Sequence, residues 1–182
     1  MPHRKKKTDR FNILLISVHG LIRADNLELG RDADTGGQTK YVVELASTLA
    51  NFDNVEQVDL LTRRVIDPNI SNDYSQPYEP ISNKAQIVRL EAGPEAYLPK
   101  EELWDYLDTF ADNALAYIRE LGRTPDIIHS HYADAGYVGV RLANLLGIPL
   151  IHTGHSLGRV KRRRLLASGV KRDEIETRYN MT

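Results

Sequence analysis

An apolar run and a helical pattern flank the stretch Gly30-Arg31-Asp32-Ala33-Asp34-Thr35-Gly36-Gly37-Gln38. The apolar run, residues 12–18, is short and continuous, which is typical of a strand buried on both faces of a parallel sheet. The helical pattern begins near Gly37 and keeps apolar residues on one side up to residue 49. A strand, a long loop and a helix in this order predict an α/β domain.

The same stretch is a candidate binding site. Its adjacent glycines, Gly36 and Gly37, have no Cβ, so a ligand can approach the backbone closely. The free N–H groups at the start of a helix favour oxygen-rich or anionic groups. Asp34 and Thr35 are plausible caps for the helix, so an ordinary capped surface turn is the alternative interpretation.

The remaining sequence continues the alternation of strands and helices. Further strands are expected at residues 55–65, 85–90, 126–131 and 149–153, and helices at residues 37–51, 100–121 and 134–146. Three segments lack a clear apolar stripe. They are the loop-like segment 67–80, the basic helix or turn 158–168 and the weakly patterned segment 173–182. Right-handed crossovers between these elements predict a Rossmann-like parallel sheet with helices on both faces.

Length and composition indicate one globular domain. The chain has 182 residues, 41% of them hydrophobic, and a formal net charge of −1, so no strong overall field attracts nucleic acid or a membrane. It has no cysteine, and no apolar stretch approaches the roughly 18 residues of a membrane span. Residues 1–10 are interpreted as a basic disordered tail rather than a signal peptide, because no small-residue cleavage site follows. We therefore expect a cytoplasmic protein whose folded domain covers residues 11–182.

Most of the six histidines lie at or near predicted strand ends: His19, His129, His131, His152 and His155. The carboxyl ends of parallel strands form the edge at which such folds bind ligands. A metal centre is one interpretation, since residues 129 and 131 point to the same face of a strand. Satisfied core histidines are the other. We predict no metal, because no paired acidic motif accompanies these histidines.

Several residues near this edge suit a small polar ligand. His155 stands between glycines after the last predicted strand, where it can hydrogen-bond to a hydroxyl or a leaving-group oxygen, or cap the next helix. The basic run 161–164 fits a phosphate site, a solvated helix face or, less well without nearby aromatic residues, a nucleic-acid surface. Lys100 can approach the same edge, and Asp134 can bind sugar hydroxyls or cap its own helix. The sequence contains no dinucleotide fingerprint, Walker loop or nucleophile elbow.

Several segments resemble, in order, the sucrose-phosphate synthase family. They include Ser17-Val18-His19-Gly20-Leu21, Asp34-Thr35-Gly36-Gly37-Gln38, Tyr97-Leu98-Pro99-Lys100-Glu101-Glu102-Leu103-Trp104, His129-Ser130-His131-Tyr132-Ala133-Asp134 and Thr153-Gly154-His155-Ser156-Leu157-Gly158. The related sucrose synthases share the Asp-Thr-Gly-Gly-Gln core, whereas the Pro-Lys-Glu-Glu-Leu-Trp segment is more similar to the phosphate synthases. The resemblance implies the N-terminal, acceptor-binding half of a retaining glycosyltransferase with the GT-B fold.

The resemblance also implies an activity. The whole enzyme would transfer glucose from UDP-glucose to fructose 6-phosphate and release sucrose 6-phosphate and UDP, without a metal or other cofactor. A C-terminal domain would hold the donor, so we expect this chain alone to have little transferase activity. The alternatives are a sucrose synthase-type domain that accepts free fructose and a non-catalytic module that binds phosphosugars.

Individual residues receive roles from the same resemblance. Three would line the cleft and touch sugar hydroxyls and donor phosphates: Gly36, Gly37 and Gln38. Asp134 would hold the fructose moiety, and Lys100 and Lys161 would meet its phosphate. His155 would lie beside the reacting centre and orient the glucosyl group. The arginines at positions 162–164 receive no role.

Overall fold

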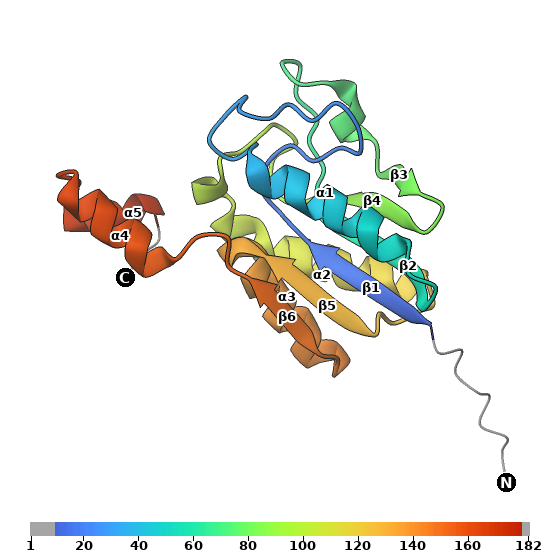
Figure 1. The fold of residues 1–182 in the computed structure, drawn as a ribbon. Coiled ribbons are helices and arrows are strands. Elements are labelled where there is room, and N and C mark those ends of the chain that lie inside the picture. The colour runs from blue at the N-terminus through green and yellow to red at the C-terminus, as the bar shows by residue number, and fades with distance from the viewer. Residues whose placement is uncertain (1–9, 180–182) are drawn as a thin grey trace, which may run out of the picture.

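The computed structural model describes residues 10–179 as a six-stranded sheet with helices on both faces (Figure 1). The strands are β1 (Phe11–Ile16), β2 (Val55–Arg63), β3 (Tyr78–Ser82), β4 (Ala85–Leu90), β5 (Ile127–His131) and β6 (Leu150–Thr153). The α-helices are α1 (Gly37–Ala50), α2 (Leu107–Glu120), α3 (Tyr132–Leu146), α4 (Gly158–Ala167) and α5 (Arg172–Tyr179). Short 3₁₀ helices are η1 (Asn72–Ser75), η2 (Lys100–Glu102) and η3 (Trp104–Tyr106). The strand order is β3-β4-β2-β1-β5-β6.

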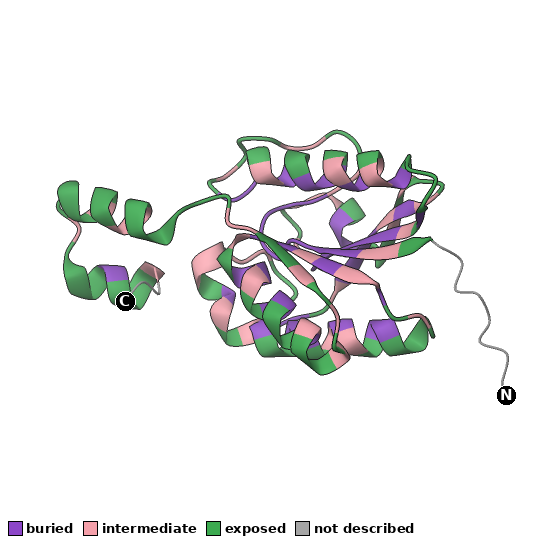
Figure 2. Cartoon of the chain, turned by 60° about the horizontal axis from the view of Figure 1, so that its bottom comes forward, coloured by how far each residue is buried: buried purple, intermediate pink, exposed green. Residues whose placement is uncertain are grey.

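β1 lies in the middle of the sheet because its side chains are apolar on both faces. Leu15 packs in one core cluster with Val42 of α1, and Leu14 packs in the other with Phe110 of α2 and Val138 of α3. Burial of each such side chain stabilises the fold by roughly 1.5–3 kcal/mol. The sheet therefore has a core on each face, which appears as the purple residues between the layers in Figure 2.

The Rossmann-like fold expected from the sequence is confirmed, with one correction to the sheet. Residues 67–80 were expected to be loop, yet this segment contains η1 and leads into β3, which pairs antiparallel with β4. β3 is an edge strand whose residues alternate between exposed and half-buried. Pro80, which has no N–H to donate, is paired with Gln86, and the register shifts between Pro80 and Ser82. Weak apolar alternation and an internal proline hid this strand, so the sheet is mixed rather than wholly parallel.

Two helix boundaries also differ from the sequence-based expectation, and both lie near the carboxyl ends of the parallel strands. The helix expected over residues 100–121 begins with the separate turns η2 and η3, and α2 starts only at Leu107. Lys100 is therefore the first residue of a short 3₁₀ turn that precedes α2. α3 starts at Tyr132 rather than at residue 134, which places Asp134 in its first turn.

The last two helices form a hairpin that projects from the sheet (Figures 1 and 2). No residue of α4 is buried, whereas α5 has one buried residue, Ile175. Both helices carry charged residues around most of their circumference, and for this reason the sequence showed no apolar stripe for α5. The hairpin is thus held to the body by few contacts.

The two ends of the chain are only partly described. Of the expected tail at residues 1–10, only Arg10 is described; it is exposed and pairs with Glu56 at 3.2 Å. Residues 180–182 of the weakly patterned terminal segment also lie outside the described range. Within residues 10–179, no helix combines the length and the apolar character needed to cross a membrane.

β6 occupies the edge of the sheet opposite β3. It has four residues and pairs in parallel with β5 on one side. Ile151, in its middle, is 49% exposed. This side of the sheet therefore presents apolar surface next to an open strand edge.

Candidate functional site

The loops that follow the parallel strands meet at one edge of the sheet, which we call the rim. There, Asp34 from the loop after β1 joins the start of η2, because its Oδ2 accepts the backbone N–H of Lys100 at 2.8 Å. Its Oδ1 forms an ion pair with Lys100 Nζ, and the Asp34 side chain is 5% exposed. Burial alone would lower the pKa of Lys100, but the bond to Asp34 raises it above its ordinary value. Lys100 is therefore a fixed cation at the rim.

A second carboxylate holds the loop after β1 in shape. Asp32 Oδ1 accepts the N–H groups of Asp34 and Thr35 at 2.8 and 2.7 Å, and the Tyr97 hydroxyl at 3.2 Å. Burial alone would raise the pKa of Asp32, but these donors keep it below its usual value. Asp32 therefore stays ionised and links the loop after β1 to the loop that leads into η2.

Neither Asp34 nor Thr35 caps α1, so this expectation was wrong. The N-cap residue is Gly36, and it provides no side chain for a capping bond. Asp34 is occupied by Lys100, and Thr35 Oγ1 accepts the N–H of Leu21 at 3.1 Å. The N-cap residue of α1 therefore makes no side-chain hydrogen bond to the free N–H groups at the start of the helix.

The glycine pair keeps the start of α1 open. A Cβ built on Gly36 or Gly37 would meet no atom within 4 Å, so internal packing does not require glycine at either position. The space is available to a ligand that approaches the backbone. Gln38 follows in the first turn and donates to Ser17 Oγ at 3.1 Å. These three residues thus lie together at the rim, as the sequence predicted.

Asp134 is almost fully buried, at 1% exposed, and both of its oxygens are engaged. Oδ2 lies 2.6 Å from Nδ1 of His19, and Oδ1 accepts the N–H of Ala135 at 2.6 Å. A carboxylate beside Nδ1 favours the proton on that nitrogen, which orients the imidazole. Asp134 therefore holds the ring of His19, in the loop after β1, and also binds an N–H of its own helix.

Three other histidines form a stack with Tyr41 of α1. The His129 and His131 rings are 4.1 Å apart, and His131 Nδ1 lies 3.0 Å from His155 Nε2. Tyr41 meets the His155 ring edge-on at 5.2 Å. Burial, followed by the neighbouring imidazoles, lowers the pKa of His131 to about 3. Because each neutral ring carries one N–H, the bond between His131 and His155 gives them complementary tautomers.

The histidine stack does not form a metal site of the usual kind. Within residues 10–179, no three His, Asp or Glu side chains are arranged to hold a metal ion. His152 points to the other face of the sheet, where its Nδ1 lies 3.0 Å from Ser130 Oγ. The alternation expected along β6 therefore separates His152 from the stack.

Two residues at the rim have a left-handed backbone although they are not glycine. φ is +76° at Tyr132, after β5, and +51° at His155, after β6. This conformation costs of order 1–3 kcal/mol for a residue with a side chain, and such outliers cluster at ligand sites. Tyr132 also packs its ring edge-on against His19, at 4.7 Å. The chain thus turns sharply at both strand ends and directs these side chains to the rim.

Lys100 and Lys161 line one cavity although they come from η2 and α4. Glu101 Oε1 lies 3.5 Å from Lys100 Nζ and 3.7 Å from Lys161 Nζ. The cavity has a volume of about 220 Å³, and its lining includes Asp134 and Tyr132. The structure therefore brings together both lysines and the aspartate that the sequence assigned to the acceptor.

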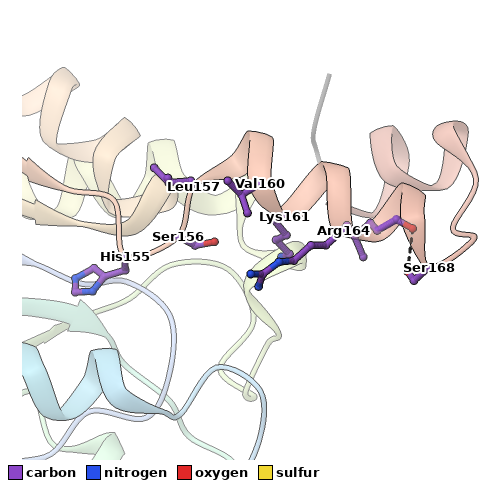
Figure 3. Close-up of a pocket in the computed structure, with 8 residues that line it drawn as sticks. His155, Ser156, Leu157, Val160, Lys161, Arg164 and Ser168 are labelled. Atoms are coloured by element: carbon purple, nitrogen blue, oxygen red, sulfur yellow. Dashed lines mark hydrogen bonds between the residues drawn. The ribbon is translucent and has the colours of Figure 1, made fainter.

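A second hollow, of about 570 Å³, runs along α4 beside His155 (Figure 3). One face of α4 and the turn before it form its lining: Ser156, Leu157, Val160, Lys161, Arg164, Leu165 and Ser168. Lys161 and Arg164 extend from the same side of the helix (Figure 3). Of the arginines at 162–164, Arg164 therefore faces the space next to the histidine stack.

The sequence did not reveal how the candidate residues are held. The sequence pattern indicated a cap for Asp34, gave Glu101 no role and did not indicate the pairing of His19 with Asp134. Three contacts join segments far apart in the chain: Asp34 with Lys100, Glu101 with Lys161, and His19 with Asp134. The contact of Glu101 with its neighbour Lys100 is local. An acidic residue next to Lys100 was the one local signal for a shared counter-ion.

Comparison with known proteins gives one consistent result. A family model described as Glycosyltransferase Family 4 matches residues 35–180. The chain is 43% identical over 198 residues to sucrose-phosphate synthase 4 of Arabidopsis thaliana, covering 97% of this chain and 19% of that protein. It is 44% identical over 204 residues to a probable sucrose-phosphate synthase of Solanum tuberosum, with the same shares.

A solved structure gives the same relationship. The sucrose-phosphate synthase from Thermosynechococcus elongatus matches with a TM-score of 0.71 at 35% identity, covering 85% of this chain and 35% of that one. The chain therefore spans about a fifth of the length of the curated relatives it matches.

Proposed function

This chain belongs to glycosyltransferase family 4, and from that premise we propose that it binds the acceptor sugar of a transferase of the sucrose-phosphate synthase type. Its Rossmann-like sheet is one half of a GT-B fold. In the proposed reaction, the whole protein transfers glucose from UDP-glucose to fructose 6-phosphate with retention of configuration. Sucrose 6-phosphate and UDP are the products.

The observation that carries this proposal is the cavity that Lys100 and Lys161 share. Two ammonium groups within 3.5 and 3.7 Å of one carboxylate oxygen are spaced to hold a single anionic group. Charge-assisted hydrogen bonds from lysines are among the stronger polar contacts, and phosphate accepts several at once. A phosphorylated hexose therefore suits this cavity better than a neutral one.

The other residues surround the sugar in this proposal. The open backbone at Gly36 and Gly37 allows close approach of hydroxyls and donor phosphates, and Gln38 offers its amide beside them. Asp134 contributes through His19, whose orientation it fixes at 2.6 Å. The proposal thus changes the sequence-based role of Asp134 from direct contact to positioning.

His155 would orient the glucosyl group. Its Nε2 is bonded to His131 at 3.0 Å, which leaves Nδ1 for the sugar among the described contacts. Burial lowers the pKa of His155, so the ring is neutral near pH 7 and can donate or accept one hydrogen bond. A neutral ring suits a role in orientation better than one in charge transfer.

The donor side requires a second domain. We propose that a C-terminal domain supplies the nucleotide site and that no metal or other resident cofactor takes part. Without that domain the donor would be held on one side only, so turnover of this chain alone should be negligible. The cytoplasmic location expected from the sequence stays a prediction.

A binding titration tests the acceptor site. Fructose 6-phosphate and fructose are titrated calorimetrically into the chain, its Lys161→Ala variant and a Lys171→Ala control, which removes an exposed lysine from the same hairpin. We expect the chain to prefer the phosphorylated sugar, and Lys161→Ala to weaken that sugar alone by about 10- to 100-fold, the range for a charged hydrogen bond. Lys171→Ala should bind like the unchanged chain.

Two outcomes would favour the alternatives. Equal affinity for both sugars, unaffected by Lys161→Ala, would indicate a sucrose synthase-type acceptor site. Binding without turnover after a donor domain of this family is added, with UDP-glucose present, would indicate a non-catalytic phosphosugar module. Restored turnover would support the transferase.

A further inference from the structure

Glu101 occupies the position between the two lysines. Its Oε1 is 3.5 Å from Lys100 Nζ and 3.7 Å from Lys161 Nζ, and its side chain is 24% exposed. Both distances exceed the usual hydrogen-bond range, so these contacts are loose ion pairs. Within residues 10–179 the Glu101 carboxylate has no hydrogen bond to the backbone or to another side chain. It is therefore weakly held.

The other carboxylate near these lysines behaves differently. Asp34 is 5% exposed and binds both the N–H and the Nζ of Lys100. It cannot leave without losing both contacts. Lys161 has a different environment, in which Glu101 and the ring of Tyr179, 5.1 Å from Nζ, are its charged and aromatic neighbours. Glu101 is therefore the exchangeable anion of the pair.

We propose that Glu101 is an internal counter-ion of the empty phosphate site, and that a phosphate must displace its carboxylate from between Lys100 and Lys161. This inference rests on the proposed function and names the residue that lowers the affinity of the site for phosphate. A phosphate dianion gains more from two ammonium groups than a single carboxylate does, so it can replace Glu101. A neutral sugar has no charge with which to compete. The partly exposed Glu101 side chain then turns towards water.

Before the phosphate arrives, the same carboxylate has a second effect. It connects α4, which carries Lys161, to η2, which carries Lys100. The two ammonium groups would otherwise repel each other across the cavity. Glu101 thus keeps the empty site assembled at the expense of its affinity for phosphate.

The test compares Glu101→Gln with Glu102→Gln, which makes the same charge change at the exposed neighbouring residue. Inorganic phosphate, fructose 6-phosphate and fructose are titrated calorimetrically into each variant and the unchanged chain. We expect Glu101→Gln to bind both phosphates about 3- to 10-fold more tightly, as expected when a competing partly exposed ion pair is removed. Fructose binding should not change, and Glu102→Gln should stay within about twofold of the unchanged chain.

Glu101→Ala provides a second variant, and its phosphate affinity should rise in the same direction. Equal or weaker phosphate binding by Glu101→Gln and Glu101→Ala, relative to Glu102→Gln, would overturn the role of Glu101. If the unchanged chain prefers fructose 6-phosphate to fructose and only the Glu101 effect is missing, the proposed function still stands. If the unchanged chain shows no such preference, both proposals fail.

Discussion

The two lysines of the cavity lie in regions that are built differently. Lys100 belongs to the rim, where a nearly buried carboxylate binds its backbone and its side chain. Lys161 belongs to the α4–α5 hairpin, where no residue of α4 is buried and the partner carboxylate lies 3.7 Å away. One wall of the cavity is therefore fixed by the sheet, and the other is loosely attached.

This difference indicates a division of tasks. A fixed wall is already in its binding geometry, so a ligand loses little free energy in ordering it. A weakly packed hairpin opens at low free energy and can adjust to what enters the cavity. The following changes would break or sharpen the contrast between rim and hairpin.

His131, the buried member of the histidine stack, should make the rim sensitive to acid. Unfolded His131 takes up a proton near pH 6.5, whereas in the folded chain burial lowers its pKa to about 3. Between these values the unfolded state binds more protons, so the free energy of unfolding should fall by several kcal/mol as the pH drops from about 6.5 to about 3. Urea denaturation at a series of pH values measures this loss. His131→Asn should give a shallower dependence, and equal slopes in both proteins would contradict this account.

Breaking the fixed ion pair should have the next largest effect. Asp34→Ala leaves Lys100 largely buried without its main partner, which should lower the free energy of unfolding by about 3 kcal/mol. The matching change in the hairpin, Lys161→Ala, removes a partly exposed pair and should cost less than about 1 kcal/mol. Chemical denaturation at pH 7 compares the two variants. Similar losses would remove the distinction between the two walls.

A change inside the hairpin should have the smallest and most local effect. Ile175 is fully buried in α5, so Ile175→Ala should reduce the free energy of hairpin opening by up to about 2 kcal/mol. Hydrogen exchange should become faster in α4 and α5 while the amides of β1 and β2 keep their rates. Faster exchange throughout the sheet would show that the hairpin is part of the main core.

The sequence predicted the fold well where apolar patterning is strong. β4 has the expected bounds, Ala85–Leu90, because a short run that includes Ile87, Val88 and Leu90 and is followed by Gly93-Pro94 is typical of a strand. β3 was missed because an edge strand with Pro80 buries too little to leave a pattern. α5 was missed for the same reason, since it buries only Ile175.

The sequence suggested candidate residues for the site but not their connections. Resemblance to a family suggested Lys100, Lys161, Asp134 and His155. In the structure the first three line one cavity, with Lys161 on the hairpin, and His155 lies beside the hollow along α4. Which carboxylate holds which cation depends on contacts between loops, and one sequence carries no record of them. Asp34 therefore looked like a helix cap because its true partner is far along the chain.

The open edge of β6 affects how the protein behaves at high concentration. An unpaired strand edge offers N–H and C=O groups to another copy, and natural sheets usually block such edges with lysine, proline or a bulge. The four residues of β6, Leu150–Thr153, include no lysine, proline or bulge. Ile151 is 49% exposed and adds apolar surface beside the open edge. Crowding of the chain should thus favour edge-to-edge self-association, and a single lysine at position 151 is the simplest change that would prevent it.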